Sequence, residues 1–315
     1  MLVFTFLVFI RIKFKSRVKQ KLLFFFLFST MLVSSQDEDF RWWNDIHDWD
    51  GITPWNSYIN VAPGTMGPNA LPVPEMRNGF LDTFYTASIS GEMHLAENEF
   101  VANAYIEANI PIKNAVSMQV TWYPYEYFIT DTTVRDFRAA RTKEAKGSAT
   151  GDLYIATVIP IVQNHAKWPD ILIGINLKTA TGNRLEDARY TDSPGYYFDA
   201  SFGKSYILKN GLVLRPHAMG GFYVYQTHDY KYVQNDAIMW GVGLDLVKNS
   251  WLFKTQLTGY SGYFNYYDSP VVFRAQVSKS IKRAKINFRY QVGNNSYNFH
   301  SLRLGVAYNF SGNWN

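Results

Sequence analysis

Charged residues at regularly spaced positions are the first feature of this sequence that could carry chemistry. They lie in stretches where polar and apolar residues alternate, and their sign changes along the chain. The acidic residues come first, at Glu92, Glu107, Asp152, Asp170 and Asp199, and the basic residues follow, at Arg215, Lys254, Arg274, Arg289 and Arg303, with Asp245 as the one acid among them. Two interpretations are open: these residues set up a field that orients a dipolar or anionic solute, or they pair with one another and hold the interior together.

Catalytic groups are less evident than charged ones. Among the six histidines, the one close His–Ser pair is His300 and Ser301. Neighbouring strand residues point to opposite faces, so these two cannot share a site on a regular strand. The histidine spacing fits no metal site, and no nucleophile elbow is present. We therefore expect no metal, no cofactor and no enzymatic activity, unless site residues gather from distant strands.

The elements that position the charges are predicted to be β-strands. The stretch FYTASISGEMHL, residues 84–95, alternates between an apolar face (Tyr85, Ile89, Met93) and a polar face (Ser90, Glu92). This period of two is typical of a strand with one apolar and one polar side. Similar stretches lie near 102–112, 116–123, 151–162, 169–178, 196–208, 212–225, 237–247, 251–260, 270–281, 284–293 and 301–310. The sequence therefore predicts twelve strands.

The connections between these strands separate into two kinds. Long connections at 126–149, 179–194, 226–236, 261–269 and 293–299 alternate with short turns such as Lys209-Asn210-Gly211 and Lys248-Asn249-Ser250. Asn and Gly accept the positive φ that tight hairpins need. Short turns at one end and long loops at the other are the arrangement of outer-membrane barrels, with the apolar face toward lipid and the charges inside.

Two further features favour a membrane barrel. Aromatic residues cluster near strand ends, as at Trp122-Tyr123 and Tyr196-Tyr197-Phe198, which suits the two interfaces of a membrane. The chain also ends on an alternating strand with Phe310 near its close. A terminal aromatic strand resembles the signal that barrel-assembly machinery recognises in its clients.

The N-terminus is predicted to be an export signal. Residues 1–35 carry six basic and no acidic residues, and the apolar run LLFFFLFSTMLVSS follows the last of these basic residues. We interpret this as a cleaved signal peptide, with an N-terminal membrane anchor as the alternative. Beyond residue 35 the chain holds 25 basic and 26 acidic residues, so its net charge is −1 and gives no sign of nucleic-acid binding. The chain has no cysteine and so no disulfide.

Residues 36–80 form a separate segment rich in tryptophan and proline. Trp42, Trp43, Trp49 and Trp55 precede the proline-rich stretch PGTMGPNALPVPEMRNG. Proline at this density excludes a central strand or a helix interior. The segment is predicted either to enter the barrel as a plug, with its tryptophans forming an apolar binding surface, or to lie under the barrel as a periplasmic strap.

The longest connection contains the one helical-looking stretch, VRDFRAARTKEAKG, residues 134–147. It carries five basic and two acidic residues. It could fold inward as a constriction, bind anionic surface glycans, or be a short solvated helix on the outer surface.

A family resemblance is carried by GDLYIATVIPI (151–161) and ILIGINLKTATGN (171–183). These stretches resemble bacterial outer-membrane proteins described as transporters of the phenol-degradation meta pathway, although Ala180 stands where that family usually has proline. The resemblance covers about residues 150–310. It implies a barrel through which small, hydrophobic molecules pass, and it implies no particular substrate.

Together these features predict an all-β protein: a closed antiparallel transmembrane barrel of about 12 strands over residues 81–315, in the outer membrane of a Gram-negative bacterium. The expected function is passive or facilitated passage of a small hydrophobic or anionic solute. A closed-lumen structural or surface-binding barrel is the first alternative, and a lipid-modifying enzyme is the second. The expected partners are outer-membrane lipid, lipopolysaccharide and the barrel-assembly machinery, with no nucleic acid.

Overall fold

The computed structural model describes residues 39–113, 115–264, 266–312 and 314, so the predicted signal peptide lies outside the described residues. The chain divides into two compact units, Met1–Trp42 and Trp43–Asn315. The second unit contains every strand that the structure describes. Within the described residues, no helix is long and apolar enough to cross a membrane.

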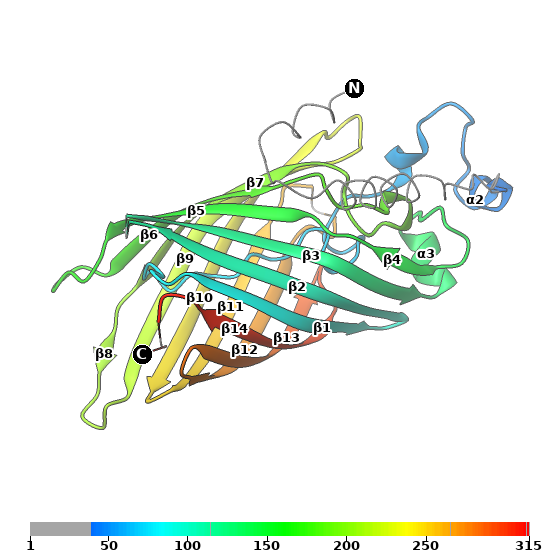
Figure 1. The fold of residues 1–315 in the computed structure, drawn as a ribbon. Helices are drawn as coiled ribbons and strands as arrows, with labels where there is room; N and C mark the ends of the chain where they lie inside the picture. The colour runs from blue at the N-terminus through cyan, green and yellow to red at the C-terminus, as the bar shows by residue number, and fades with distance from the viewer. Residues whose placement is uncertain (1–38, 114, 265, 313, 315) are drawn as a thin grey trace, which may run out of the picture. The chain divides into compact units, whose positions relative to one another are not determined.

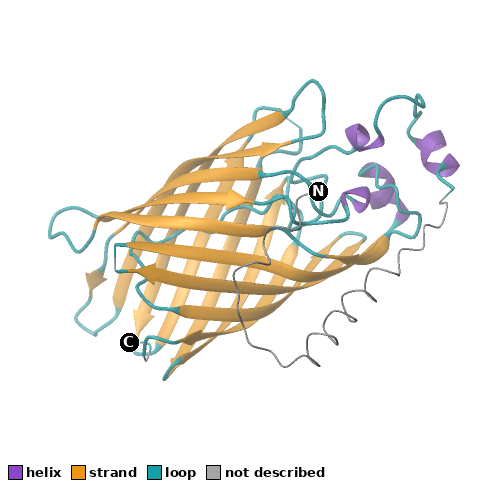
Figure 2. Ribbon diagram, turned by 45° about the horizontal axis from the view of Figure 1, so that its top comes forward, coloured by secondary structure: helices purple, strands orange, loops and turns teal. Residues whose placement is uncertain are grey.

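The second unit is a closed antiparallel β-barrel (Figures 1 and 2). Its long strands are β1 (Thr86–Ala96), β2 (Glu99–Ile112), β3 (Val116–Thr130), β5 (Leu153–Val162), β6 (Asp170–Lys178), β7 (Gly195–Gly203), β9 (Val213–Gln226), β10 (Gln234–Lys248), β11 (Trp251–Ser261), β12 (Pro270–Ile281), β13 (Ala284–Asn295) and β14 (His300–Asn309). Each pairs with the next, and β1 pairs with β14, so the sheet has no free edge among these strands. The predicted 12-strand barrel is confirmed.

The alternation along each strand sets the two faces of the wall. On β1, Ile89 and Met93 are exposed, whereas Ser90, Glu92 and His94 are buried. A barrel wall that exposes apolar side chains outward and buries polar ones inward matches a lipid-facing exterior. The predicted orientation of the apolar face is therefore confirmed.

The two ends of the barrel differ as the sequence predicts. The end that we call the long-loop end holds the connections after β1, β3, β6, β9, β11 and β13. The tight-turn end holds the hairpins after β2, β10 and β12, where Lys113, Asn249 and Lys282 have positive φ. The connections at the long-loop end also carry the short helix α3 (Thr132–Phe137) and the 3-10 helix η2 (Leu185–Asp187).

The helical prediction for 134–147 is wrong in its second half. Helix α3 ends at Phe137, and the chain then forms the short strand β4 (Lys146–Ala149), which extends the sheet by pairing with β3. Arg135 and Arg138 are buried rather than solvated, because Arg138 donates to both carboxylate oxygens of Glu99. Burial of these guanidinium groups anchors the connection over the barrel end.

The predicted strand 196–208 is also shorter than expected. Strand β7 ends at Gly203, and the chain resumes pairing only in β8 (Tyr206–Ile207), against the start of β9. The gap lies opposite Pro216, which has no backbone N–H to donate to the ladder. The missing donor explains why the ladder is interrupted at this point.

Residues 59–84, which we call the interior segment, cross the barrel from end to end (Figure 1). At the long-loop end, the N–H groups of Gly64 and Gly67 donate to the carbonyls of Tyr267 and Ala188. At the tight-turn end, the N–H of Leu81 donates to Gln163, in the hairpin before β6. The segment has no strand or helix of its own, and it follows α2 (Arg41–Ile46) and η1 (Trp55–Tyr58).

Between its ends the interior segment is held by side chains of the wall. The amide of Gln256 donates to the carbonyl of Met76, at 2.6 Å, and the hydroxyl of Tyr260 donates to the carbonyl of Leu71, at 3.0 Å. An extended chain that forms no ladder leaves its own carbonyls unpaired, and a buried unpaired carbonyl is costly. The wall therefore supplies the hydrogen bonds that the segment cannot make for itself.

The wall and the segment meet most closely at two glycines. A Cβ atom on Gly203 would clash with the carbonyl oxygen of Asn78, and Gly79 adopts a φ of +84° against the backbone of Gly203. We expect Gly203→Ala to destabilise the folded barrel by about 1–3 kcal/mol, the usual cost of overpacking. The measurement is the temperature at which the compact, heat-modifiable band disappears on electrophoresis.

Gly220→Ala is the matched control for this variant. Gly220 lies on the neighbouring strand β9, and a Cβ atom there would meet no described atom within 4 Å. Its transition temperature should stay at the wild-type value. A Gly203→Ala barrel as stable as the Gly220→Ala barrel would show that the segment does not press on the wall.

Candidate functional site

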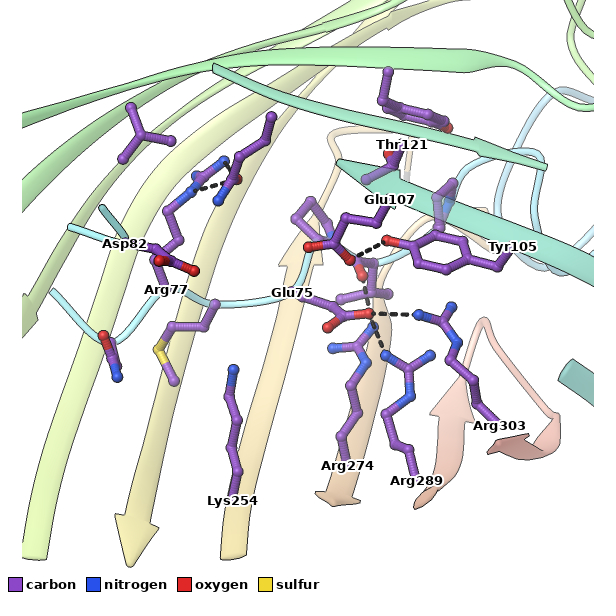
Figure 3. A pocket seen from close by; sticks show the side chains of 18 of the residues that line it. Glu75, Arg77, Asp82, Tyr105, Glu107, Thr121, Lys254, Arg274, Arg289 and Arg303 are labelled. Carbon is purple, nitrogen blue, oxygen red and sulfur yellow. Dashed lines mark hydrogen bonds and ion pairs between the residues drawn. The ribbon is translucent and has the colours of Figure 1, made fainter. Parts of the chain in front are cut away.

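The barrel encloses a cavity of about 630 Å³ between the interior segment and the wall (Figure 3). Residues 68–84 form one side, and side chains from β1–β3, β5–β7 and β11–β14 form the other. The cavity reaches the tight-turn end, where the rings of Phe84 and Trp314 meet edge to face. Its volume is in the range of small-molecule sites.

Three neighbouring strands place charges at one level of the cavity wall. Arg289 on β13 lies opposite Arg303 on β14, and Arg303 lies opposite Glu92 on β1. Adjacent like charges on a sheet repel, and here a shared carboxylate offsets that repulsion. Glu92 binds Arg289 at 2.9 Å and Arg303 at 2.8 Å, one guanidinium on each oxygen.

Glu75 of the interior segment adds a second carboxylate to this pair of guanidinium groups. Its Oε1 contacts Arg289 and lies 3.5 Å from Nη1 of Arg303 (Figure 3). Glu92 is 1% exposed, whereas the Glu75 side chain is 44% exposed to the cavity. The wall carboxylate is thus enclosed, and the carboxylate of the segment is accessible.

Two more cationic side chains, those of Arg274 and Lys254, lie near Glu75. Arg274 on β12 donates to Gln291, to Thr258 and to the carbonyl of Val73, all of them neutral acceptors. Lys254 on β11 also lines the cavity, and it forms no ion pair within 4 Å in the part of the chain that the structure describes. The positive charge of this wall is therefore only partly neutralised.

The opposite wall receives a cation from the same segment. Arg77 binds Asp199 at 2.6 Å and also donates to Asn176 and Gln119, at 2.8 and 3.0 Å. Glu75 and Arg77 lie two residues apart and contact opposite walls. Glu75 contacts the basic wall, at Arg289 and Arg303, and Arg77 contacts the acidic wall, at Asp199. The segment complements the charge separation that runs across the lumen.

The long-loop end of the lumen is sealed by a second ionic cluster. Arg189, which is fully buried, binds Glu99 at 2.6 Å and Glu126 at 2.8 Å and lies over the ring of Phe128. Burial lowers the pKa of the Arg189 guanidinium, but Glu126 and Glu99 outweigh it and hold that pKa above its usual value. Arg189 is therefore a permanent cation at the point where the loop 179–194 folds inward.

An apolar cluster lies beside this ionic seal and joins the interior segment to the wall. Its buried members are Ile59, Val61, Met66, Ala70, Leu71, Val73, Leu185, Ala188, Tyr223, Tyr225, Ala237, Met239, Tyr260, Val272, Tyr297 and Phe299. Side chains that interdigitate in this way leave little space for water. The lumen is thus closed toward the long-loop end and hollow toward the tight-turn end.

The predicted lumen residues all occupy the interior, in two groups. Those that line the cavity are Glu92, Glu107, Lys254, Arg274, Arg289 and Arg303. Those that do not are Asp152, Asp170, Asp199, Arg215 and Asp245, which are buried in local contacts such as Asp152 with Lys178 and Asp170 with Arg215, each pair at 2.7 Å. Glu75 and Arg77 are central to the site, and the sequence analysis missed both.

The tryptophans considered as plug residues do not line the cavity. The indole N–H of Trp43 donates to the carbonyl of Ala139, and Arg141 lies over the rings of both Trp43 and Trp55. Trp49 donates to the carbonyl of Thr53 within its own turn. Trp43 and Trp55 thus pack at the long-loop end, and Trp42 belongs to the first unit. The residues that enter the cavity follow the tryptophans in sequence.

Three strands bring together a Ser–His–Asn arrangement that the sequence did not reveal. Ser301 donates to Nδ1 of His94 at 2.8 Å, and Nε2 of His94 donates to Asn103 Oδ1 at 3.0 Å. Ser301 is 1% exposed and is not among the residues that line the cavity. A nucleophile must be reached by its substrate, so this arrangement serves to link β14, β1 and β2.

Solved structures similar to this chain are bacterial outer-membrane barrels. An outer membrane channel from Pseudomonas putida F1 matches 76% of this chain and 100% of its own, with a TM-score of 0.50 and 12% identity. The KdgM porin (TM-score 0.42, 12% identity, 71% and 99% of the chains) and the transport unit of the autotransporter AIDA-I from Escherichia coli (0.44, 12%, 82% and 99%) match less well.

The likeness to the Pseudomonas channel shows the fold, which is that of a multi-pass outer-membrane β-barrel. Neither the protein-family models nor the curated proteins that were compared with this chain gave a match. The resemblance to phenol-degradation transporters therefore stays a prediction.

The shared carboxylate of the basic wall can be tested directly. Glu92→Gln leaves two adjacent guanidinium groups without their enclosed counter-charge, so we expect a loss of about 3–5 kcal/mol, the usual effect of breaking a buried pair. The measurement is urea unfolding, followed by the loss of the compact band. Glu97→Gln, an exposed carboxylate between β1 and β2, is the control and should unfold as the wild type does. Equal stability of the two variants would contradict the assignment.

Proposed function

We propose that this protein is an outer-membrane channel for a small solute and that its own interior segment closes it. The observation that carries the proposal is the course of residues 59–84 through the lumen, from the long-loop end to the tight-turn end. The barrel supplies a route across the membrane, and the segment occupies that route. Passage of a solute then requires the segment to move.

The two halves of the lumen are proposed to have different roles. The cavity at the tight-turn end is the place where a solute resides, because it is hollow and polar. The apolar cluster and Arg189 at the long-loop end form the barrier. Opening involves the segment and the loop 179–194 together, because Gly67 is hydrogen-bonded to Ala188 of that loop.

The lining of the cavity favours an anionic solute with an apolar body. Six basic side chains line it against four acidic ones: Arg77, Lys254, Arg274, Lys285, Arg289 and Arg303 against Glu75, Asp82, Glu92 and Glu107. Tyrosines and the aliphatic side chains of Val158 and Leu172 supply apolar surface. An excess of one charge in a narrow lumen selects ions of the other charge. The resemblance to phenol-degradation transporters agrees with a small aromatic solute.

A closed-lumen structural barrel is the second candidate. The buried ion pairs favour it, since Arg189 with Glu99, and Lys178 with Asp152, tie loop and wall together without a ligand. A lipid-modifying enzyme has less support, because its best candidate nucleophile, Ser301, is enclosed.

Conductance in planar bilayers separates the first two candidates. We expect low conductance from the full mature protein and a large increase from a variant lacking residues 41–78, because the deletion removes residues 59–78 of the segment and leaves the strands intact. A heat-modifiable band is the control for a folded barrel. Folded barrels that are silent with and without the segment would favour the closed-lumen alternative.

Ion selectivity tests the role of the basic wall. In the variant without the segment, replacing Arg274, Arg289 and Arg303 together by Gln should shift the reversal potential from anion toward cation selectivity. Arg274→Gln alone should shift it in the same direction by less, and it leaves Glu92 paired with the other two arginines. A conducting barrel whose selectivity is unchanged by the triple replacement would rule out these residues as the selective wall.

A further inference from the structure

We infer that the guanidinium groups around Glu75 are a binding site for a small organic carboxylate, and that Glu75 occupies this site until the carboxylate displaces it. The inference deepens the proposed function and rests on it, since it assigns both the solute class and the event that loosens the interior segment. The contacts of Glu75, the charge around it and the surface that faces it all support this assignment.

Glu75 has the features of an exchangeable ligand. It contacts the same two guanidinium groups as Glu92, but its side chain is 44% exposed, against 1% for Glu92. It belongs to a segment without regular secondary structure, whereas Glu92 is fixed in β1. Carboxylates bind guanidinium through short, charge-assisted hydrogen bonds. A free carboxylate in the cavity can make the contacts that Glu75 makes.

The surroundings of Glu75 hold enough positive charge for a second anion. Arg289 and Arg303 are shared between Glu75 and Glu92, while Arg274 contacts only neutral acceptors and Lys254 forms no described ion pair. A small void of about 10 Å³ also lies between Glu75 and the wall, lined by Lys254, Gln256, Arg274, Gln276 and Arg289. The wall around Glu75 therefore presents cations and amides, which are the groups that bind carboxylates.

Aromatic side chains lie beside the guanidinium groups, which suits a carboxylate with an aromatic body. Tyr105 lies across the cavity from Glu75, with Glu107 beside it, and the Arg303 guanidinium lies 3.9 Å from the centroid of the Tyr105 ring (Figure 3). Tyr123 packs on Tyr105 with ring centroids 5.3 Å apart, and both line the cavity. Both tyrosines are buried, so a ring attached to the bound carboxylate would meet their edges, in the edge-to-face arrangement that aromatic pairs accept.

Binding and release of the segment are coupled because they compete for the same atoms. When Glu75 leaves the arginines, residues 73–76 lose their ion pairs, and they keep the wall's hydrogen bonds to the carbonyls of Val73 and Met76 and the packing of Val73 in the apolar cluster. A ligand that binds better to the displaced state shifts the population toward that state. The carboxylate would thus loosen the segment that blocks its route.

The test uses the full mature protein in detergent, with benzoate as the probe and benzamide as its neutral counterpart, titrated by calorimetry. We expect benzoate to bind the wild type weakly and Glu75→Gln at least about tenfold more tightly, because the internal competitor is removed. Benzamide should bind neither protein. Benzoate affinity that is equal in the wild type and Glu75→Gln, or benzamide binding equal to that of benzoate, would overturn the inference.

Glu107→Gln is the matched control, because Glu107 lines the same cavity but is hydrogen-bonded to Tyr105 and not to the arginines. If Glu107→Gln tightened binding as much as Glu75→Gln, a general loss of negative charge would explain both, and displacement would be wrong. Tight benzoate binding to Glu75→Gln in a barrel that never conducts would leave the site standing and refute the channel. Conductance after removal of residues 41–78, without benzoate binding to Glu75→Gln, would support the channel and refute the carboxylate site.

Discussion

Lipid offers no hydrogen-bond partner to a backbone N–H or C=O group, and this constraint governs the whole protein. It requires a closed barrel, which the pairing of β1 with β14 completes. Closure places every second side chain in an enclosed lumen, and in this chain many of those side chains are charged. The lumen therefore inherits a second requirement, because its charges need partners of opposite sign.

The interior segment meets much of that second requirement. Glu75 and Arg77 each pair with a charged group of the wall, and Asn69 donates to Glu126 at 2.7 Å. The same segment takes hydrogen bonds from the wall through its carbonyls. Segment and wall thus stabilise each other, although the cavity beside Glu75 shows that their fit is incomplete on one side. The protein combines tight packing toward the long-loop end with accessible charge toward the other.

The sequence was sufficient to predict the wall but not its contents. Alternation and turn residues locate strands well, because each strand is a local pattern whose face is fixed by a period of two. The predicted ends of elements were wrong where contacts between distant residues decide them. Pro216 lies opposite the end of strand β7, and Arg138, just after helix α3, pairs with Glu99. The predicted inward charges on β12–β14 follow from the same local pattern.

The site itself depends on contacts between residues far apart in the chain. Glu75 and Arg289 are separated by 214 positions, and His94 and Ser301 by 207, so no local spacing reveals either pair. The tryptophans drew attention to the N-terminal segment because of their density, yet the side chains that line the cavity lie further along, in Pro-Glu-Met-Arg. The available signal for the site was the pair Glu75 and Arg77, a carboxylate and a guanidinium two residues apart in a proline-rich stretch.

The course of the interior segment also constrains how the molecule is made. Residues 59–84 immediately precede β1, and β1 must pair with β14, more than 200 residues later, to close the wall. Once the wall is closed, the segment could reach its place only by passing through the lumen, past the side chains that line it. Closing the wall around a segment that is already in place avoids this passage, so we expect the segment to lie in the lumen before β1 and β14 pair. In the proposed channel, this order of assembly would leave each molecule closed when it forms.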